Sequence, residues 1–191
     1  MNILSRDGTA IYYGRIFDAE TGRAYFESLS STLPWRHDEV AMFGKRVVTA
    51  REVAWFADAG IPYRYSGTVK QAVPWTLELA EIKARIEEIT GLTFNSCLAN
   101  LYHHGGEGMG WHSDDEKSLV KHAAIASLSL GAERMFSFRH KHDAETISLL
   151  LENGSLLLMK DETQDHWKHA LPKSAKIKGP RINLTFRTMV A

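Results

Sequence analysis

Positions 112 and 114 carry two side chains that bind transition metals well. They stand in the run Trp111-His112-Ser113-Asp114-Asp115. In an extended chain, residues two apart share a face and lie about 6–7 Å from each other, so both side chains can converge on one ion. A neutral imidazole and a carboxylate suit iron(II), manganese or zinc. Because such pairs also occur by chance in solvated loops, a metal site needs a third ligand from elsewhere in the chain.

The third ligand has two candidates, His166 and His169, which both lie in the run His-Trp-Lys-His-Ala-Leu-Pro at 166–172. Two histidines and one carboxylate on one face of an ion leave coordination positions open, which is typical of non-haem iron oxygenases. A zinc hydrolase could use the same ligands and keep one position for water. These residues alone therefore decide neither which histidine is the third ligand nor which metal is bound.

The run 181–187 has strict two-residue alternation. Its polar face holds Arg181, Asn183, Thr185 and Arg187, and its apolar face holds Ile182, Leu184 and Phe186. Most amphipathic strands simply turn the polar face to water, but arginine also binds carboxylates in a bidentate manner and stays charged when partly buried. A metal cluster together with this strand indicates a keto-acid cosubstrate that chelates the metal. A simple zinc hydrolase would not need such a strand.

The spacing of the remaining histidines gives little reason to assign them to a metal site. His140 and His142 also stand two apart, but they follow a strand-like run close to an expected hairpin turn. We predict that both are plain surface residues, and we expect the same of His103, His104 and His122.

Composition bounds the class of protein. The 191 residues include 23 Lys and Arg against 23 Asp and Glu, so the net charge gives no general indication of a nucleic-acid partner. Cys97 is the single cysteine, which excludes an intrachain disulfide and favours an intracellular protein, in the cytoplasm or nucleoid if the source is bacterial. We expect no signal peptide and no membrane span, because the sequence lacks a suitable apolar run.

Two helices and many short strands must position these residues. We predict helices over 18–33, capped by Asp18 and ended by Pro34, and over 75–90, ended by Gly91. Short strands are expected at 10–17, 96–102, 123–130, 134–139, 145–151, 155–159, 166–171 and 181–188, and the segment 39–66 is interpreted as short strands and exposed loops. This order predicts an α+β, mainly β fold: a double-stranded β-helix, or jelly roll, buttressed by the N-terminal helices.

The length suits one domain over 1–191. Within it we expect an N-terminal extension with the helices over 1–93 and the jelly-roll core over 94–191.

Several ordered motifs resemble the AlkB family of oxidative nucleic-acid demethylases, and within it the DNA-repair branch. The motifs are Asn-Leu-Tyr at 100–102, His-Ser-Asp-Asp-Glu at 112–116, Ala-Ser-Leu-Ser-Leu-Gly at 126–131, Phe-Ser-Phe-Arg-His at 136–140, Gly-Ser-Leu-Leu-Leu-Met at 154–159, and the runs 166–172 and 181–187. The resemblance covers about 40–191, whereas residues 1–40 match no recognition element of the family.

The resemblance implies a role for each matching residue. The family's iron ligands fall on His112, Asp114 and His169, which makes His166 a neighbour rather than a ligand. Its 2-oxoglutarate contacts fall on Asn100, Tyr102, Arg181, Asn183, Thr185 and Arg187. Its nucleotide-recognition lid and other substrate contacts fall on Phe43, Gly44, Lys45, Tyr63, Arg64, Tyr65, Asp115 and Glu116. Lys45, Arg46, Arg51 and Arg64 would add positive charge for phosphates.

The implied activity uses iron(II), 2-oxoglutarate and dioxygen, with ascorbate as a reductant in assays. It would demethylate bases of the 1-methyladenine and 3-methylcytosine type in DNA and release formaldehyde, succinate and carbon dioxide. We expect a monomer that binds alkylated DNA, with RNA as a further partner, and no membrane. Two alternatives stay open: the same chemistry on an RNA or protein substrate, and a non-catalytic metal-containing binding module.

Overall fold

Two antiparallel sheets form the framework of the computed structural model, which describes residues 1–42, 45–59, 61, 63–65, 68–70 and 72–190, with the backbone alone at 38–42, 45–47, 63–65 and 68–70. The large sheet has the order β1 (Thr9–Arg15), β11 (Ser155–Lys160), β8 (Ile125–Gly131), β13 (Arg181–Arg187), β6 (Ser96–Tyr102), β3 (Lys45–Ala57) and β2 (Arg36–Met42). The small sheet has the order β10 (Thr146–Leu151), β9 (Arg134–His140), β12 (Trp167–Leu171) and β7 (Met109–His112). β4 (Tyr63–Tyr65) pairs with β5 (Thr68–Lys70) in a third, two-stranded antiparallel sheet. The predicted jelly roll is confirmed.

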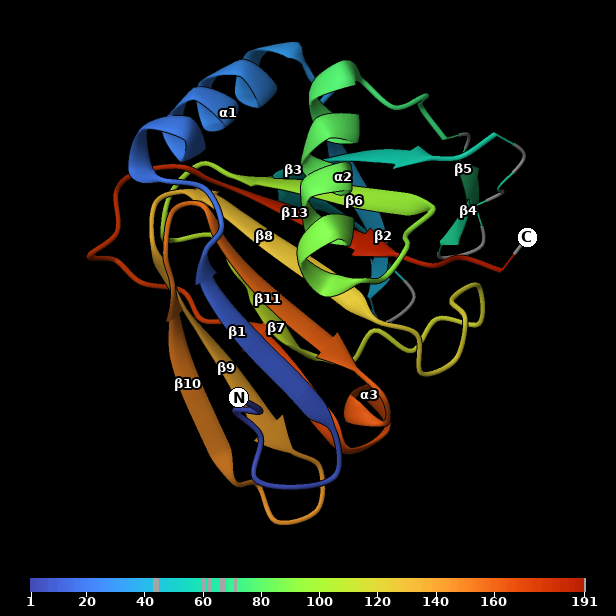
Figure 1. Ribbon diagram of the computed structural model, residues 1–191, viewed down its shortest axis with the longest axis vertical. Helices are drawn as coiled ribbons and strands as arrows, with labels where there is room; N and C mark the ends of the chain where they lie inside the picture. The colour runs from blue at the N-terminus through green and yellow to red at the C-terminus, as the bar shows by residue number, and fades with distance from the viewer. Residues whose placement is uncertain (43–44, 60, 62, 66–67, 71, 191) are drawn as a thin grey trace.

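The two predicted helices are α1 (Ala19–Thr32) and α2 (Leu77–Thr90), and both lie against the large sheet (Figure 1). Asp18 caps α1 by accepting a hydrogen bond from the Thr21 amide, and Gly91 ends α2 in the left-handed conformation that glycine adopts easily. Leu29 of α1 and Ile82 and Ile86 of α2 are fully buried in one cluster with the outer face of the sheet. The helices therefore buttress the sheet, as predicted from their apolar spacing.

The strand β13 separates the two environments of the large sheet. Its apolar residues Ile182, Leu184 and Phe186 belong to the cluster under the helices. Because side chains alternate along a strand, the polar set of β13 must point the other way, into the space between the two sheets. A second apolar cluster, which includes Phe138 and Trp167 of the small sheet and Leu157 of the large sheet, closes that space at one end.

The segment 39–66 is more regular than the sequence predicts. The short strand β4 agrees with the prediction, but over the first part of the segment β2 pairs with the thirteen-residue β3, and β3 pairs with β6 over Glu52–Ala57. The run Val53–Ala57 is buried at every position, so it lacks the alternation that would have identified a strand. The large sheet also takes in β1 through its pairing with β11, so the boundary expected at residue 93 runs through one continuous sheet.

We expect Leu184→Ala to lower the free energy of unfolding by about 2–5 kcal/mol, because it removes a side chain with 0% exposure from the core under the helices. Chemical denaturation measures the change. Leu77→Ala is the matched control: Leu77 is 85% exposed at the start of α2, so its truncation should change stability by no more than about 0.5 kcal/mol. Equal effects of the two substitutions would contradict the assigned core.

Candidate metal and cosubstrate site

The antiparallel pairing of β7 with β12 sets His112 directly opposite His169. Their rings lie 4.3 Å apart between centroids, at an angle of 66°. His166, the other candidate from the sequence, ends the short helix α3 (Thr163–His166) before β12 begins, and its ring lies beside His140 instead. The register of two strands thus decides between the two histidines.

Asp114 completes the cluster two residues after His112. Its Oδ1 lies 3.5 Å from the Nε2 atom of His112 and 3.5 Å from the Nε2 atom of His169. Its other oxygen, Oδ2, accepts a hydrogen bond of 2.6 Å from the guanidinium of Arg187 on β13. Arg187 therefore fixes the carboxylate so that one oxygen faces both imidazoles. The three side chains form one of two groups in the described part of the chain whose ligand atoms lie within 4.8 Å of one another.

The protonation of these groups suits a cation. The Nδ1 atom of His112 lies 2.8 Å from the Gly110 carbonyl oxygen, which fixes the tautomer that leaves Nε2 free to bind a metal. Burial, together with the nearby His169, lowers the pKa of His112 and favours the neutral ring that metals require. Burial alone would raise the pKa of Asp114, but Arg187 and His169 outweigh it and hold that pKa well below its usual range.

A cavity of about 70 Å³ opens between the sheets beside this cluster. All six residues predicted to contact 2-oxoglutarate line it: Asn100, Tyr102, Arg181, Asn183, Thr185 and Arg187. A single water needs roughly 10–15 Å³ of such space, so the cavity can hold a small organic acid in part or whole. Two strands of the large sheet, β6 and β13, supply these six residues in register, with Asn100 opposite Asn183 and Tyr102 opposite Arg181.

Arg181 provides the test of whether an acidic cosubstrate fits this cavity. Its side chain is 2% exposed, and among the described residues no carboxylate forms an ion pair with it. Its Nη2 donates to the Ser129 hydroxyl at 2.9 Å, its charge lies 5.7 Å from the Tyr102 ring, and its buried Nε has no hydrogen-bond partner. Burial lowers the pKa of Arg181 to about 10, with nearby Arg134 adding to the effect and Tyr102 opposing it. A buried cation without a counter-ion fits a ligand carboxylate.

A larger groove of about 830 Å³ also adjoins the metal cluster. His112 and Asp114 form part of its wall, and so do the predicted substrate residues Asp115 and Glu116. Asp115 is exposed, whereas Glu116 is half-buried with its Oε1 at 3.6 Å from Arg187. The metal cluster thus borders both a small cavity that suits an acid and a groove of a size that admits a nucleotide base.

Most side chains of the predicted lid lie outside the described part of the structure. Phe43 and Gly44 lie outside the described residues. Lys45 lies in β3, and Tyr63, Arg64 and Tyr65 form β4, but their side chains are also outside the described part. Their contacts with a substrate stay predictions.

The structure adds residues that the sequence reasoning did not assign to the site. Ser127 and Ser129 of β8 lie on the inner face and accept hydrogen bonds from Asn183 and Arg181. Arg51, expected to serve phosphates, instead reaches inward, where its Nε donates to the Asn100 side chain at 3.1 Å. The Ser-x-Ser alternation at 127–129 could have indicated the first pair, but nothing local indicates where Arg51 points.

A jelly roll that holds two histidines and an aspartate beside a buried arginine defines the class of non-haem iron oxygenases with a keto-acid cosubstrate. The family model of the 2OG-Fe(II) oxygenase superfamily matches residues 9–187, and the chain belongs to this superfamily. Iron(II), 2-oxoglutarate and dioxygen are therefore its cofactor and cosubstrates, as predicted.

Comparison with curated proteins confirms the AlkB resemblance. The chain is 41% identical over 160 residues to the DNA oxidative demethylase ALKBH2 of Mus musculus, covering 80% of this chain and 67% of that protein. It is 40% identical over 159 residues to the human protein of the same name, covering 79% and 61%, respectively. It is 37% identical over 187 residues to the human alpha-ketoglutarate-dependent dioxygenase alkB homolog 3, covering 93% and 65%. The chain thus spans about two thirds of the length of these relatives.

The fold also matches a solved structure, "The structure of OsALKBH1", with a TM-score of 0.63 and 16% identity over 97% of this chain and 100% of the other. At this identity the likeness concerns the fold alone. No helix in the described ranges has the length and apolar character needed to cross a membrane.

Proposed function

We propose that this protein is an iron(II)- and 2-oxoglutarate-dependent demethylase that acts on N-alkylated bases in nucleic acid, with DNA as the preferred substrate. One observation carries the proposal: residues of the His112, Asp114 and His169 cluster line both a cavity that holds the buried Arg181, which has no carboxylate partner among the described residues, and a groove open to solvent. The names of the curated relatives, DNA oxidative demethylase among them, support the nucleic-acid substrate.

His112, Asp114 and His169 would hold the iron, with the carboxylate turned toward both imidazoles by Arg187. Arg181 would bind the far carboxylate of 2-oxoglutarate through the guanidinium edge that no carboxylate of the described chain occupies. Bound iron, 2-oxoglutarate and dioxygen supply the oxidation of an N-methyl carbon, which leads to formaldehyde, succinate and carbon dioxide.

The apolar wall of the cavity would keep water from the oxidation chemistry. Phe136 stacks on His169 with ring centroids 5.5 Å apart, and Met109, Met159 and Leu171 line the same space. A dry pocket strengthens the ion pairs that orient the cosubstrate and suppresses side reactions. The chain's own contribution is therefore placement and exclusion of solvent.

The groove would receive a base that has left the helical stack. Methylation at the Watson–Crick edge of 1-methyladenine or 3-methylcytosine breaks pairing, so extrusion of these bases costs less than extrusion of an intact base. Arg36 and His37 line the groove, and the exposed Arg36 supplies positive charge toward a phosphate backbone. The same groove admits single-stranded RNA, which makes RNA the alternative nucleic-acid substrate.

The test is formaldehyde release by the purified chain with iron(II), ascorbate and 2-oxoglutarate. We expect release from an oligonucleotide with 1-methyladenine or 3-methylcytosine, and none from the unmethylated oligonucleotide or without 2-oxoglutarate. Competition among methylated DNA, methylated RNA and a methylated peptide ranks the substrates. Turnover of 2-oxoglutarate that only the peptide stimulates would contradict a nucleic-acid substrate, and no 2-oxoglutarate-dependent turnover at all would favour a non-catalytic binding module.

A further inference from the structure

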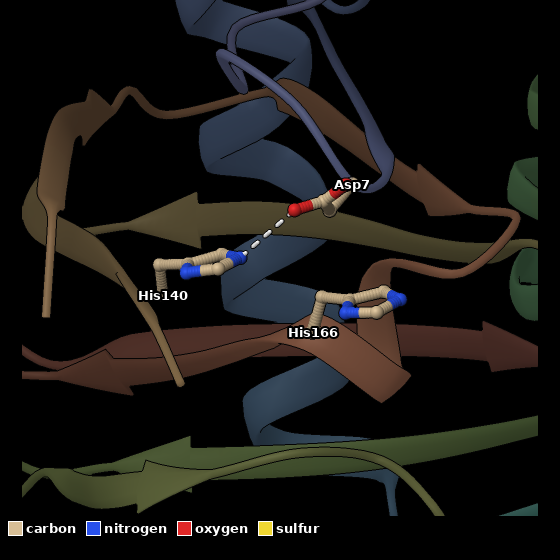
Figure 2. Close-up of side chains that lie close together, drawn as sticks. All are labelled: Asp7, His140 and His166. Atoms are coloured by element: carbon tan, nitrogen blue, oxygen red, sulfur yellow. Dashed lines mark hydrogen bonds and ion pairs between the residues drawn. The ribbon is translucent and has the colours of Figure 1, made fainter. Parts of the chain in front are cut away.

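A second group of potential metal ligands lies apart from the site above. It consists of Asp7, His140 and His166, whose ligand atoms all lie within 4.8 Å of one another. Figure 2 shows the carboxylate of Asp7 directed at the ring of His140, with the ring of His166, at the end of α3, beside them. The three residues come from the loop before β1, the end of β9 and the residue before β12. None of them lines the cavity or the groove beside the first cluster.

The backbone holds this group in place. The Lys141 amide donates to the His166 carbonyl at 2.8 Å, so the two histidine-bearing segments are hydrogen-bonded side by side. The two imidazole rings are nearly parallel, at 6°, with centroids 6.4 Å apart. Asp7 has a positive φ of 50°, which a non-glycine residue adopts seldom and which turns its side chain within the loop. The backbone therefore brings the three residues together, and only the side chain of His166 must rotate to complete a site.

His140 has the surroundings of a metal-binding histidine. It is 4% exposed, although the sequence predicted a surface residue, because Trp167 packs edge-on against its ring at 4.9 Å. Its Nδ1 lies 3.2 Å from the Asp143 carboxylate, and its Nε2 lies 3.2 Å from Asp7. A carboxylate that accepts the Nδ1 proton orients the ring and leaves the lone pair of Nε2 for a cation, as in many metal sites.

A plain ion pair is the competing explanation, with a protonated His140 between Asp7 and Asp143. That arrangement does not account for His166, whose ring stacks parallel to a ring that would be cationic and whose ligand nitrogen lies within 4.8 Å of the ligand atoms of Asp7 and His140. The local charge also favours an added cation. Apart from the two histidines, Arg6 is the one basic group in these ion pairs, against the four carboxylates of Asp7, Asp143, Glu145 and Glu162.

We propose that Asp7, His140 and His166 form a second divalent-cation site, distinct from the iron centre and suited to zinc. Two imidazoles and one carboxylate are ligands that zinc takes readily, with water in the fourth position on the exposed side. Zinc–ligand bonds of about 2.0–2.1 Å set tetrahedral ligand atoms roughly 3.3 Å apart. The separation of 3.2 Å between Asp7 and His140 already matches this, and rotation of the half-exposed His166 closes the site.

A zinc ion here would fasten the N-terminal segment to the barrel. It would join Asp7 to β9 and to the end of α3 just before β12, next to the hydrogen bond of 3.0 Å from the Trp167 indole to the Arg6 carbonyl oxygen. Trp167 and His169 lie on the same strand, β12, so the ion would brace the strand that carries a ligand of the first cluster. The expected effect of zinc at this site is on thermal stability.

The experiment must prevent zinc from entering the first cluster, so the parent is the full chain with Asp114→Asn and His169→Gln, which circular dichroism must show to be folded before zinc is added. We expect this parent, stripped of metal, to bind one equivalent of zinc in competition with a chromophoric chelator and to gain thermal stability. Adding Asp7→Asn or His166→Gln should weaken zinc binding at least about 10-fold and remove the gain in stability. Both substituted residues are surface-accessible, which keeps the fold intact without zinc.

His142→Gln is the matched control, because His142 is exposed and stacks 6.4 Å from His140 without belonging to the group. We expect it to leave the zinc affinity of the parent unchanged. The proposal is overturned if the parent binds no zinc, or if Asp7→Asn and His166→Gln bind zinc as tightly as the parent. Neither result bears on demethylation, which the intact first cluster would carry.

Discussion

Asp114→Ala is expected to reduce 2-oxoglutarate-dependent formaldehyde release at least about 10³-fold. The substitution removes the carboxylate that lies 3.5 Å from both imidazole Nε2 atoms and leaves two neutral ligands. A bound metal contributes several kcal/mol to such a reaction, and about 4 kcal/mol corresponds to three orders of magnitude in rate. The measurement is formaldehyde release from a methylated oligonucleotide under saturating iron and 2-oxoglutarate.

Loss of Asp114 also leaves Arg187 buried without the carboxylate that it contacts at 2.6 Å. We therefore expect reduced stability as well, and circular dichroism must show that the variant is folded at the assay temperature. Asp114→Asn keeps the shape and removes the charge, so it should lose activity with a smaller loss of stability. Glu88→Gln, an exposed acid of α2 paired with Arg85, should keep full activity. A folded Asp114→Ala protein with undiminished turnover would disprove the assigned iron cluster.

Local rules predicted those parts of the site that lie within one strand. Side chains two apart share a face, which placed His112 with Asp114 and split β13 into a polar and an apolar side. Both predictions are confirmed, the second by the burial of Ile182, Leu184 and Phe186 under the helices. The helix ends could also be predicted from local sequence, because Asp18 and Gly91 form hydrogen bonds with residues of their own helices.

Two features of the protein could not be predicted from local sequence, the third metal ligand and the burial of His140, because both depend on pairing between distant strands. The choice between His166 and His169 rests on the register of β12 against β7, which joins segments more than fifty residues apart. Spacing within 166–172 carries no information about that register. The choice of His169 in the sequence analysis therefore rests on the family resemblance alone. The burial of His140 is similar, because it arises from Trp167 on a neighbouring strand and from the loop around Asp7.

The β2–β3 hairpin shows a different limit of the sequence. Strand prediction relies on alternation, and alternation disappears where both faces are covered. Val53, Trp55 and Phe56 are all buried, with Phe56 under the helices and Trp55 in a small separate cluster with Met189. A strand that packs on both sides has the same apolar run as a buried helix segment. Long-range packing, rather than any local signal, makes this segment a strand.

The second large effect concerns Arg181, where we expect opposite changes in cosubstrate affinity and in stability. Arg181→Met should raise the KM for 2-oxoglutarate roughly 10- to 150-fold, because a hydrogen bond to a charged group contributes about 1.5–3 kcal/mol. The same substitution should leave the cosubstrate-free protein at least as stable as the wild type. The buried guanidinium forms no ion pair with a carboxylate in the described part of the chain, and an apolar side chain of similar size avoids its desolvation cost.

Arg134→Met is the matched comparison, since Arg134 is also 2% exposed but has a different set of partners. Its Nη2 atom donates to the carbonyl oxygens of Glu107 and Pro172, at 2.9 Å each, and it does not line the cosubstrate cavity. Its loss leaves buried carbonyl oxygens without a hydrogen-bond donor, which lowers the free energy of unfolding by about 1–3 kcal/mol for each unsatisfied group. We therefore expect lower stability and an unchanged KM for 2-oxoglutarate in the folded variant. If Arg181→Met instead destabilises the protein as Arg134→Met does and leaves the KM unchanged, then Arg181 is a structural residue and the cosubstrate must be held by another group.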